Sequence, residues 1–199
     1  MTAMKLLAFT DPHESLVAIK EVEKKAKNAE LLVCAGDISI FEQELDAFLA
    51  RINKIGKTVL LIHGNHEGEQ LTETLCQGLK NLVFIHKKLH RIGNYVFIGY
   101  GGGGFDEREP DFEKFIEKNI AKIKPDEKIV LITHGPPYGT RLDVIGKGHH
   151  GCKSYAKYIR ILKPELYICG HFHETFGLKD KLGKTLIINP GPKGMLVEI

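Results

Sequence analysis

Residues able to bind a metal ion or to move a proton follow the ends of five short apolar runs. The runs and their endings read LLAFTDPH, LLVCAGD, VLLIHGNHE, IVLITHGPP and LYICGHFHE. Their reactive residues are carboxylates, one amide and imidazoles: Asp11, His13, Asp37, Asn65, His66, His134, His171 and His173. Because sites in α/β proteins form outside the carboxyl ends of strands, the sequence predicts one shared site if these strands are adjacent.

Two pairs of these residues are separated by a single position. On an extended chain, residues i and i+2 point to the same side. We therefore expect Asp11 and His13 to reach into one cavity, and His171 and His173 to do the same. We also expect the glycines that precede three candidate ligands to supply unusual backbone angles at the strand ends. These glycines are Gly36, Gly64 and Gly170.

The chemistry of this set favours divalent metal ions. Carboxylate, amide and imidazole groups suit Mn, Fe, Co, Ni or Zn, and the absence of cysteine from the set argues against a thiolate zinc site. The ligands are too many for one tetrahedral ion and about right for two ions that share a carboxylate. Two-metal sites hold their ions about 3.5–4 Å apart and stabilise the attacking and leaving oxygens of an in-line displacement.

In this order, the five motifs resemble those of the calcineurin-like metallophosphoesterase family. The family pattern D-x-H, G-D, G-N-H-[DE], H-G and G-H-x-H corresponds here to DPH (11–13), GD (36–37), GNHE (64–67), HG (134–135) and GHFH (170–173). The stretch from THGPPYGTRLD to GHFHETFG is also similar to the small stand-alone branch of the family, which includes class III cyclic-nucleotide phosphodiesterases. The resemblance spans almost the whole chain.

The resemblance implies two divalent metal ions as cofactors, with Mn²⁺ as the first choice and Fe, Zn, Ni, Co or Mg as alternatives. It divides the ligands into Asp11, His13 and His173 for the first ion, Asn65, His134 and His171 for the second, and Asp37 as the bridge. His66 would bind no metal. It would lie over the site, where it would contact the phosphoryl oxygen or protonate the leaving group.

The implied activity is hydrolysis of a phosphate ester, with diesters favoured over monoesters. A bound divalent ion lowers the pKa of water from 15.7 to about 7, so a metal-bridging hydroxide would attack in line without a phospho-enzyme. The substrate would be a small phosphate ester, with a nucleotide as one option. Two alternatives stay open: a non-catalytic scaffold on the same fold, as for some relatives, and a nuclease for short oligonucleotides.

Composition narrows the classes of partner. With 28 basic and 25 acidic residues, the net charge is +3 at pH 7, which predicts no basic surface for long nucleic acid. The four cysteines form no C-x-x-C pair and are expected to be free thiols in a reducing compartment, most of them buried. No apolar run suits a signal peptide or a membrane span. We therefore expect a cytoplasmic protein without a membrane partner, and no sequence feature supports a homo-oligomer.

Short apolar runs alternate with longer amphipathic segments, which predicts a layered α/β fold with mixed sheets. The expected strands are 5–9, 31–35, 58–62, 82–85, 95–100, 128–133, 166–169, 185–189 and 195–199. The expected helices are about 14–28, 41–55, 69–79, 110–123 and 151–162. Hairpins are expected within 82–100 and 166–199, where no helix fits. The resemblance specifies an α-β-β-α sandwich of two mixed sheets flanked by helices, in one domain over 1–199.

The loops at 99–112 and 138–152 are expected to form the rim of the site and to select the substrate. The first contains GYGGGG (99–104), which lacks the ending of a phosphate-binding Walker loop. Candidate substrate contacts lie in the second loop: Tyr138, Arg141, Lys147, His149 and His150.

Other polar residues lie near or outside the motifs. Among the histidines outside the motifs, His63 should face away from the ligands, and His86 and His90 should lie on the surface. Glu67 and Glu174 each follow a ligand motif. Each is expected either to orient a ligand histidine or to lie as a cap or surface acid.

Overall fold

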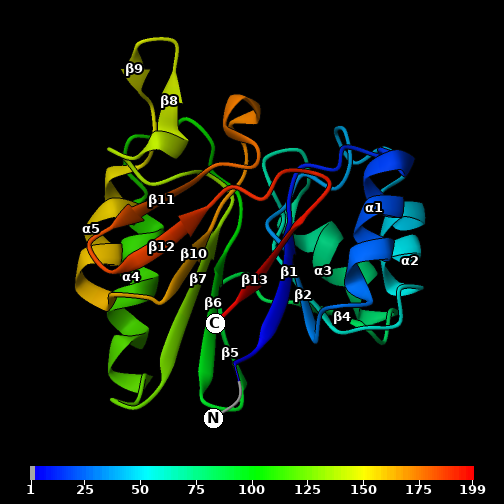
Figure 1. The fold of residues 1–199 in the computed structure, drawn as a ribbon, viewed down its shortest axis with the longest axis horizontal. Helices are drawn as coiled ribbons and strands as arrows, with labels where there is room; N and C mark the ends of the chain where they lie inside the picture. The colour runs from blue at the N-terminus through cyan, green and yellow to red at the C-terminus, as the bar shows by residue number, and fades with distance from the viewer. Residues whose placement is uncertain (1–2) are drawn as a thin grey trace.

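The computed structural model describes residues 3–199, and its framework is a pair of β-sheets (Figure 1). The five strands of the first sheet are, in order, β13 (Met195–Glu198), β1 (Lys5–Phe9), β2 (Leu31–Cys34), β3 (Val59–Leu61) and β4 (Leu82–Phe84). The six strands of the second are β11 (Lys179–Leu182), β12 (Thr185–Ile188), β10 (Leu166–Ile168), β7 (Lys128–Thr133), β6 (Tyr95–Tyr100) and β5 (Lys88–Ile92). A small hairpin projects from the body: β8 (Val144–Ile145) and β9 (Gly148–His149).

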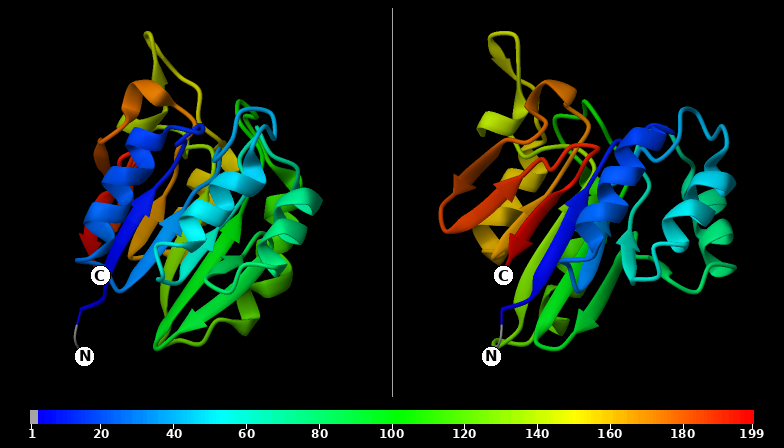
Figure 2. Two further views of the ribbon diagram at one scale, coloured as in Figure 1. Left: turned by 90° about the vertical axis from the view of Figure 1, so that its right-hand side faces the viewer. Right: turned by 45° about the vertical axis from the view of Figure 1, so that its right-hand side comes forward.

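Helices cover the outer faces of both sheets (Figure 2). The first sheet is covered by α1 (Leu16–Ala26), α2 (Leu45–Asn53) and α3 (Glu69–Gln77), and the second by α4 (Pro110–Asn119) and α5 (Lys153–Leu162). Short 3₁₀ helices complete the chain: η1 (Ile120–Lys122), η2 (Arg141–Asp143) and η3 (His173–Thr175). The predicted α-β-β-α sandwich of two mixed sheets is therefore confirmed.

Side chains of each central strand alternate between two apolar layers. Leu7 and Phe9 of β1 pack with α1 to α3, whereas Leu6 and Ala8 pack between the sheets. A third apolar layer joins the second sheet to α4 and α5. Because both faces of these sheets are buried, their central strands read as continuous apolar runs.

All the expected strands and helices are present, with slightly shorter ends, but two longer strands were missed. These are β5 (KLHRI) and β11 (KDKL), which lie at the two edges of the second sheet. Their side chains are largely exposed or half-buried. Edge strands often carry charged residues that discourage pairing with other chains, so these two lack the apolar run by which a buried strand is recognised.

The predicted hairpin between 82–85 and 95–100 is wrong. β4 pairs in parallel with β3 in the first sheet, whereas β6 lies in the second sheet and forms its hairpin with β5. Near the C-terminus, β11 and β12 form an antiparallel hairpin, but β10 pairs with β12 in parallel. β13 then returns to the first sheet and pairs antiparallel with β1. Each of these regions thus carries the chain from one sheet to the other.

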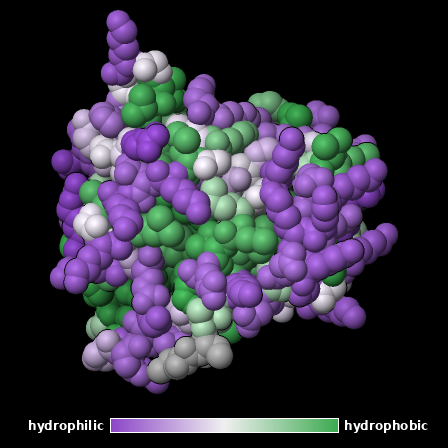
Figure 3. All heavy atoms as spheres, viewed as in Figure 1, coloured by the Kyte–Doolittle hydropathy of each residue, from purple (hydrophilic) through white to green (hydrophobic). Residues whose placement is uncertain are grey.

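One face of the protein is mainly polar (Figure 3), and the four cysteines form no disulfides. The face in Figure 3 is largely hydrophilic, with an apolar area near its middle. All four cysteines are free, as expected, and all four rather than most of them are buried. Within residues 3–199, no helix is both long and apolar enough to cross a membrane.

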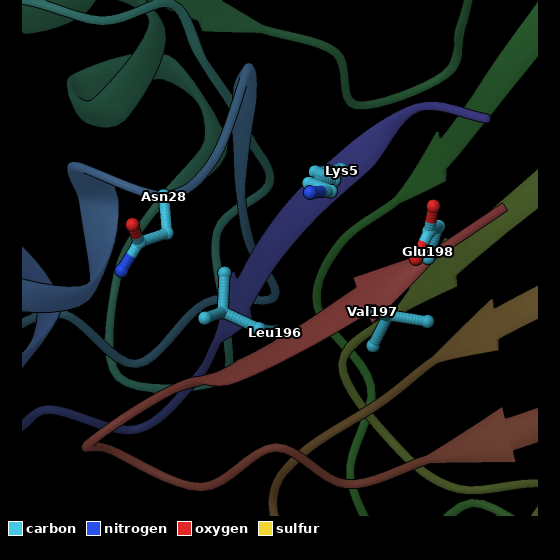
Figure 4. A pocket seen from close by; sticks show the side chains of 5 residues that line it. All are labelled: Lys5, Asn28, Leu196, Val197 and Glu198. Carbon is cyan, nitrogen blue, oxygen red and sulfur yellow. The ribbon is translucent and has the colours of Figure 1, made fainter. Parts of the chain in front are cut away.

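A groove beside the C-terminal strand is separate from the predicted site (Figure 4). It is lined by Lys5, Asn28, Leu196, Val197 and Glu198. Lys5 begins β1, whereas Asp11 follows the other end of that strand. At about 3.3 Å per residue of strand, the two places lie roughly 20 Å apart.

Candidate metal centre

The two sheets bring five strand ends together. In the first sheet, Asp11 follows β1, Asp37 follows β2 and the segment 64–67 follows β3. In the second sheet, His134 follows β7 and the segment 170–173 follows β10. β1, β2 and β3 are parallel neighbours, as are β7 and β10. Their carboxyl ends therefore lie side by side, which is the arrangement that the sequence predicted.

Six of the candidate ligands, together with His66, form three overlapping groups. Within each group the ligand atoms lie within 4.8 Å of one another: Asp11, His13 and His173; His13, Asp37 and His66; and Asp37, His134 and His171. Asp37 Oδ2 lies 3.7 Å from His13 Nε2 and 3.3 Å from His134 Nε2. The carboxylate of Asp37 therefore stands between the two halves of the cluster.

Side-chain distances within each half are short. On one side, Nε2 of His173 lies 3.3 Å from Nε2 of His13 and 3.6 Å from Oδ1 of Asp11. On the other side, Asn65 Oδ1 lies 3.0 Å from His134 Nε2. All seven predicted ligands are thus brought together, although their role as ligands remains a proposal.

Tight turns, rather than extended strands, aim these side chains into the cavity. Asp11, His13, Asp37 and His171 have left-handed backbones with φ of 52°, 41°, 54° and 67°, and His173 begins η3. The expectation of an extended chain at 11–13 and 171–173 is therefore wrong, even though the side chains converge. Non-glycine residues seldom adopt this conformation, and strain of this kind clusters at functional sites.

The glycines before the candidate ligands serve two different purposes. Gly36 has the unusual backbone that was expected, with φ of 97°. Gly64 and Gly170 do not have a positive φ, but they allow close approach. A Cβ on Gly64 would overlap Asp37 Oδ1, and a Cβ on Gly170 would overlap Thr10 Oγ1. The loops can therefore meet only because these two residues lack a side chain.

Backbone carbonyl groups orient two of the imidazoles. His13 Nδ1 lies 3.1 Å from the carbonyl oxygen of Ser39, and His134 Nδ1 lies 2.8 Å from that of Ala35. In both rings Nδ1–H donates to the carbonyl, which leaves Nε2 free to face the cluster. This arrangement fixes the tautomer that a metal ligand needs.

Glu67 joins the loop after β2 to the loop after β3 through buried hydrogen bonds. It is buried, and its two carboxylate oxygens accept hydrogen bonds from the backbone N–H groups of Asp37 (3.0 Å), Ser39 (2.7 Å) and Gly64 (3.0 Å). The Ser39 hydroxyl donates to it as well, at 3.1 Å. Glu67 was expected either to orient a ligand histidine or to be a cap or surface acid. It is buried and fixes the backbone of the ligand loops rather than a histidine. Glu174 is exposed.

The charges of the cluster are set by burial and by Asp37. Burial alone would raise the pKa of Asp37, but the hydrogen bond and charge of His134 outweigh it and lower this pKa to about 2. Burial would lower the pKa of His134, but Asp37 raises it to about 9. For His171, burial and then the charge of His134 lower the pKa to about 4. Without a metal ion, Asp37 is therefore ionised, and His134 holds a proton that a bound cation would displace.

The donor set fits a pair of divalent cations. Carboxylate, amide and imidazole donors surround Asp37 on two sides, which matches the preferences of borderline and hard ions. Nε2 of His171 is buried, and none of residues 3–199 offers it a hydrogen bond. Because buried polar atoms are normally paired, this nitrogen is open to a ligand that the chain itself does not provide.

Comparison with known proteins agrees with this geometry. The sequence pattern of calcineurin-like phosphoesterases matches residues 4–175. The chain belongs to this family. Calcineurin-like phosphoesterases are hydrolases that depend on a dinuclear metal centre, and the overlapping groups around Asp37 offer ligands on two sides, as such a centre requires.

Relatives and solved structures extend the match. A protein of Methanocaldococcus jannaschii is 32% identical over 98% of this chain and 91% of its own length. A UPF0046 protein of Caenorhabditis elegans is 28% identical over 94% of this chain and 69% of its own.

Among solved structures, TT1561 of Thermus thermophilus gives a TM-score of 0.78 at 17% identity, over 96% of this chain and 90% of that chain. A dimetal phosphatase of Danio rerio gives 0.64 at 10% identity, over 94% of this chain and 87% of that one. At these identities the structural likeness supports the fold alone.

The cleft above the cluster is small and does not include the predicted rim contacts. It has a volume of about 370 Å³ and is lined by His13, Asp37, Ile40, His66, His171 and His173. Tyr138, Arg141, Lys147, His149 and His150 lie instead in and around η2 and the β8–β9 hairpin. Their contact with substrate remains a prediction.

Asp143 organises this rim segment. Its carboxylate accepts hydrogen bonds from the backbone N–H groups of Gly139, Thr140 and Gly151, and from His149 Nδ1 at 2.7 Å. The imidazole of His149 lies 5.6 Å from the ring of Tyr138. The rim loop therefore has a defined shape that depends on one buried carboxylate.

The prediction that His86 lies on the surface is wrong. His86 is 4% exposed, because its ring packs among those of His63, Phe84 and Tyr100, and its backbone forms an isolated parallel bridge with Gly99. Its Nδ1 accepts a hydrogen bond from Gly101 N at 2.7 Å, and its ring lies 4.5 Å from that of His63. His63 is buried under the glycine loop and belongs to none of the ligand groups, as expected. His90 is half-buried on β5.

Two exposed phenylalanines that no sequence motif indicated pack against residues that line the cleft. Phe41 lies against His66, and Phe105 lies against His171, with ring centroids 4.5 Å and 4.7 Å apart. An isolated phenylalanine in a loop carries no pattern from which exposure or function can be inferred. Only the tertiary structure sets these two beside the cluster.

Proposed function

We propose that this chain hydrolyses phosphate diesters in preference to monoesters, with two bound divalent ions of which Mn²⁺ gives the highest activity. The observation that carries the proposal is the position of Asp37 between two groups of ligand atoms. A carboxylate in this position can serve two ions at once, which is what a two-metal displacement requires.

The proposed ligands divide as the family pattern implies. One ion would be held by Asp11, His13 and His173, the other by Asn65, His134 and His171, with Asp37 shared. When bound, the ions supply Lewis acidity to the phosphoryl oxygens and lower the pKa of water. The backbone hydrogen bonds to Glu67 and the carbonyl contacts of His13 and His134 keep the ligand atoms in place.

His66 is the proposed acid–base residue. Its backbone N–H donates to Asp37 Oδ1 at 3.0 Å, and its Nε2 lies 3.9 Å from Asp37 Oδ2. The side chain is 22% exposed at the cleft, so one edge of the ring can reach a substrate. From there it can give a proton to the leaving oxygen. An alkoxide leaving group needs this proton most, which favours diesters of poor leaving groups.

The openness of the cleft also supports a diester. A phosphodiester carries an organic group on each side of phosphorus, so both need room. His173 and His66 both line the cleft, and their side chains are 55% and 22% exposed. The cleft is therefore open to solvent beside both histidines, which leaves room for a second organic group on the ester.

The test compares two diesters with a monoester in the presence of Mn²⁺. The diesters are bis-p-nitrophenyl phosphate and glycerophosphoethanolamine, and the monoester is p-nitrophenyl phosphate. His66→Ala should lower kcat by about 10²–10⁴-fold for the alkyl diester. The loss should be smaller for bis-p-nitrophenyl phosphate, whose leaving group is stable without a proton. His90→Ala is the matched control, because His90 lies on β5 outside the cluster.

Metal dependence is tested on the same substrates. Chelation should abolish hydrolysis, and Mn²⁺ should restore it. Hydrolysis that survives chelation would contradict the metal mechanism. Protein that holds two ions per chain but turns over no ester would favour the scaffold function instead.

A further inference from the structure

His66 differs from two neighbouring imidazoles in how its ring is held. Nδ1 of His13 and Nδ1 of His134 each meet a backbone carbonyl oxygen, at 3.1 Å and 2.8 Å. Nδ1 of His66 is also buried, but no group in the described part of the chain forms a hydrogen bond with it. Its Nε2 lies 3.9 Å from Asp37 Oδ2, which is beyond hydrogen-bond distance. Hydrogen bonds thus fix the first two rings, whereas the ring of His66 depends on packing.

Two aromatic rings pack against His66. The ring of Phe41 lies 4.5 Å from it, centroid to centroid, at an interplanar angle of 36°, and the ring of His13 lies 4.9 Å away at 74°. Aromatic pairs attract each other at such distances and favour particular orientations. His13 is already one of the proposed metal ligands, whereas Phe41 carries no group that binds a cation through nitrogen or oxygen. The contact of Phe41 with His66 is therefore separate from the metal site.

The hydrophobic core does not explain the place of Phe41. The residue is 72% exposed, and it belongs to none of the three apolar layers found within residues 3–199. Phenylalanine contributes to stability mainly through the apolar area that it buries, and Phe41 buries little. Its contact with the imidazole is what remains to account for its position.

The backbone is strained where it presents Phe41. Phe41, Glu42 and Glu44 have φ of 51°, 65° and 46°, and a left-handed backbone at a bulky residue is a genuine outlier. Strain of this kind persists only where the surroundings impose it, and it clusters at functional sites. The loop therefore keeps a shape that its own residues disfavour, and in this shape it sets Phe41 against His66.

Hydrogen bonds tie the strained loop down on both sides of Phe41. On one side, Glu14 Oε1 accepts a hydrogen bond from Ile40 N at 2.7 Å. On the other side, Glu42 Oε1 accepts one from Gly68 N at 2.8 Å. Gly68 lies two residues after His66, so Glu42 joins the Phe41 loop directly to the segment that carries the imidazole. The relative position of the two rings is thus fixed by their backbones.

We propose that Phe41 is a positioning residue, which holds the imidazole of His66 in the orientation from which it protonates the leaving group. In this orientation Nδ1 is turned into the protein, and Nε2 lies on the side of Asp37, which lines the cleft. Without the ring of Phe41, the imidazole can turn about its side-chain bonds, and Nε2 spends less time near the leaving oxygen. This inference rests on the proposed function, because it explains how the proton donor assigned there is kept in place.

The kinetic test uses the two diesters in the presence of Mn²⁺. Glycerophosphoethanolamine has an alkoxide leaving group that needs the proton, whereas bis-p-nitrophenyl phosphate needs it little. In Phe41→Ala the ratio of kcat for the first to kcat for the second should fall roughly 2- to 12-fold, the factor that one aromatic pair represents. KM should stay unchanged, since a group that acts on the leaving oxygen only in the transition state alters kcat. Phe41→Tyr keeps the ring and should retain the wild-type ratio.

A second measurement is independent of hydrolysis. The order parameter of the His66 ring is obtained from ¹³C relaxation of its Cε1–H group in the metal-free protein, with the signal assigned by its loss in His66→Ala. Phe41→Ala should lower this order parameter into the range of flexible groups, below about 0.6, and Phe41→Tyr should not. The ring of His13 is the internal reference, because its hydrogen bond to Ser39 O should keep it equally ordered in the wild type and in Phe41→Ala.

Phe105→Ala is the matched control. Phe105 is 69% exposed and has the same side chain as Phe41, but its ring packs on His171, 4.7 Å away, rather than on His66. This variant should leave both the ratio of kcat values and the order parameter of His66 unchanged. Metal content and thermal melting of each variant show whether the cluster and the fold are intact.

The outcomes separate this inference from the proposed function. An unchanged ratio in Phe41→Ala, an equal loss on both diesters, or an unchanged order parameter of His66 would each overturn the positioning role. A change of the same size in Phe105→Ala would do so as well. If the wild type hydrolyses neither diester, or if His66→Ala hydrolyses both at the wild-type rate, the proposed function fails instead. The order parameter then decides by itself whether Phe41 holds the ring.

Discussion

Two histidine clusters lie at neighbouring strand ends, and a buried histidine in each, His134 or His86, lies at the same distance from a carboxylate oxygen but has a different charge. Asp37 Oδ2 lies 3.3 Å from His134 Nε2, and Glu69 Oε2 lies 3.3 Å from His86 Nε2. The pKa of His134 is raised to about 9, whereas that of His86 is lowered to about 3. The side chain of Asp37 is 2% exposed, but that of Glu69 is 45% exposed and also pairs with Lys87 at 3.3 Å.

The burial of the carboxylate therefore decides what each cluster can do. Asp37 acts on His134 through a low-dielectric interior, where charges interact strongly. The charge of Glu69 is screened by water and shared with Lys87, so burial dominates at His86. The cluster around Asp37 can exchange the proton of His134 for a cation. The other cluster supplies the neutral rings of His63 and His86, which pack under the loop 99–104.

Asp37→Asn should break the first cluster and have the largest effect. The amide removes the charge that both halves of the site share, so metal affinity should fall by more than the 10- to 100-fold typical of groups that only orient ligands. Metal content after dialysis and hydrolysis of bis-p-nitrophenyl phosphate measure the loss. Asp126→Asn, an exposed carboxylate outside the cluster, serves as the control. Retention of both ions by Asp37→Asn would contradict the shared-ligand role.

Glu67→Gln should weaken the cluster without touching a metal ion. One oxygen of Glu67 accepts from Asp37 N and Gly64 N, and the other accepts from Ser39. Glutamine keeps only one acceptor oxygen, so about two donors are left unpaired. We expect a 10- to 100-fold loss of metal affinity and roughly 1–3 kcal/mol of stability per unpaired buried group. Unchanged metal affinity in calorimetric titration would show that the loop position does not depend on this carboxylate.

His86→Gln should sharpen the contrast through the pH dependence of stability. The pKa of His86 lies below the ordinary value of 6.5 because of burial and the charge of His63. The unfolded chain therefore takes up this proton first, and stability falls as the pH falls from 6.5 toward 3. At pH 5 the loss is at most about 2 kcal/mol. The glutamine can still accept the hydrogen bond of Gly101 N.

The measurement for His86→Gln is the free energy of unfolding in urea at pH 7 and pH 5, with a chelator present so that metal release does not contribute. The difference between the two pH values should be about 1–2 kcal/mol smaller in the variant than in the wild type. The exposed His150→Gln should match the wild type. A wild-type difference retained in full by His86→Gln would contradict the assignment.

His149→Ala should have the smallest effect. Its Nδ1 lies only 2.7 Å from Asp143 Oδ1, but the side chain of His149 is 44% exposed. Partly exposed ion pairs contribute little, and Asp143 keeps its three backbone donors. We expect a stability change below about 1 kcal/mol and no loss of bound metal. A large loss of stability would mean that proximity, rather than burial, governs these pairs.

Local patterns were sufficient for the central strands, the helices and the motif residues that the structure brings together around Asp37. The apolar runs at 5–9 and 128–133 are recognisable because strands buried on both faces carry continuous hydrophobic residues. Edge strands such as β5 have no such run, and the pairing partner of β4 depends on contacts far along the chain. Neither the edge strand β5 nor the pairing of β4 can be recognised from the residues of a single short segment.

The sequence by itself determined that carboxylates and imidazoles follow successive strands. Because parallel strands in α/β sheets end at one edge, it also determined that these side chains would gather at that edge. Only the tertiary structure decided how they converge. The left-handed turns at Asp11 and His171 and the close approach of loops at Gly64 and Gly170 arise from contacts between segments distant in sequence. The same holds for His86, buried beside the rings of His63 and Tyr100, and for Phe41, which a strained loop holds in solvent. Residue type fixes which chemistry is available, whereas burial and packing between distant segments fix which chemistry is used.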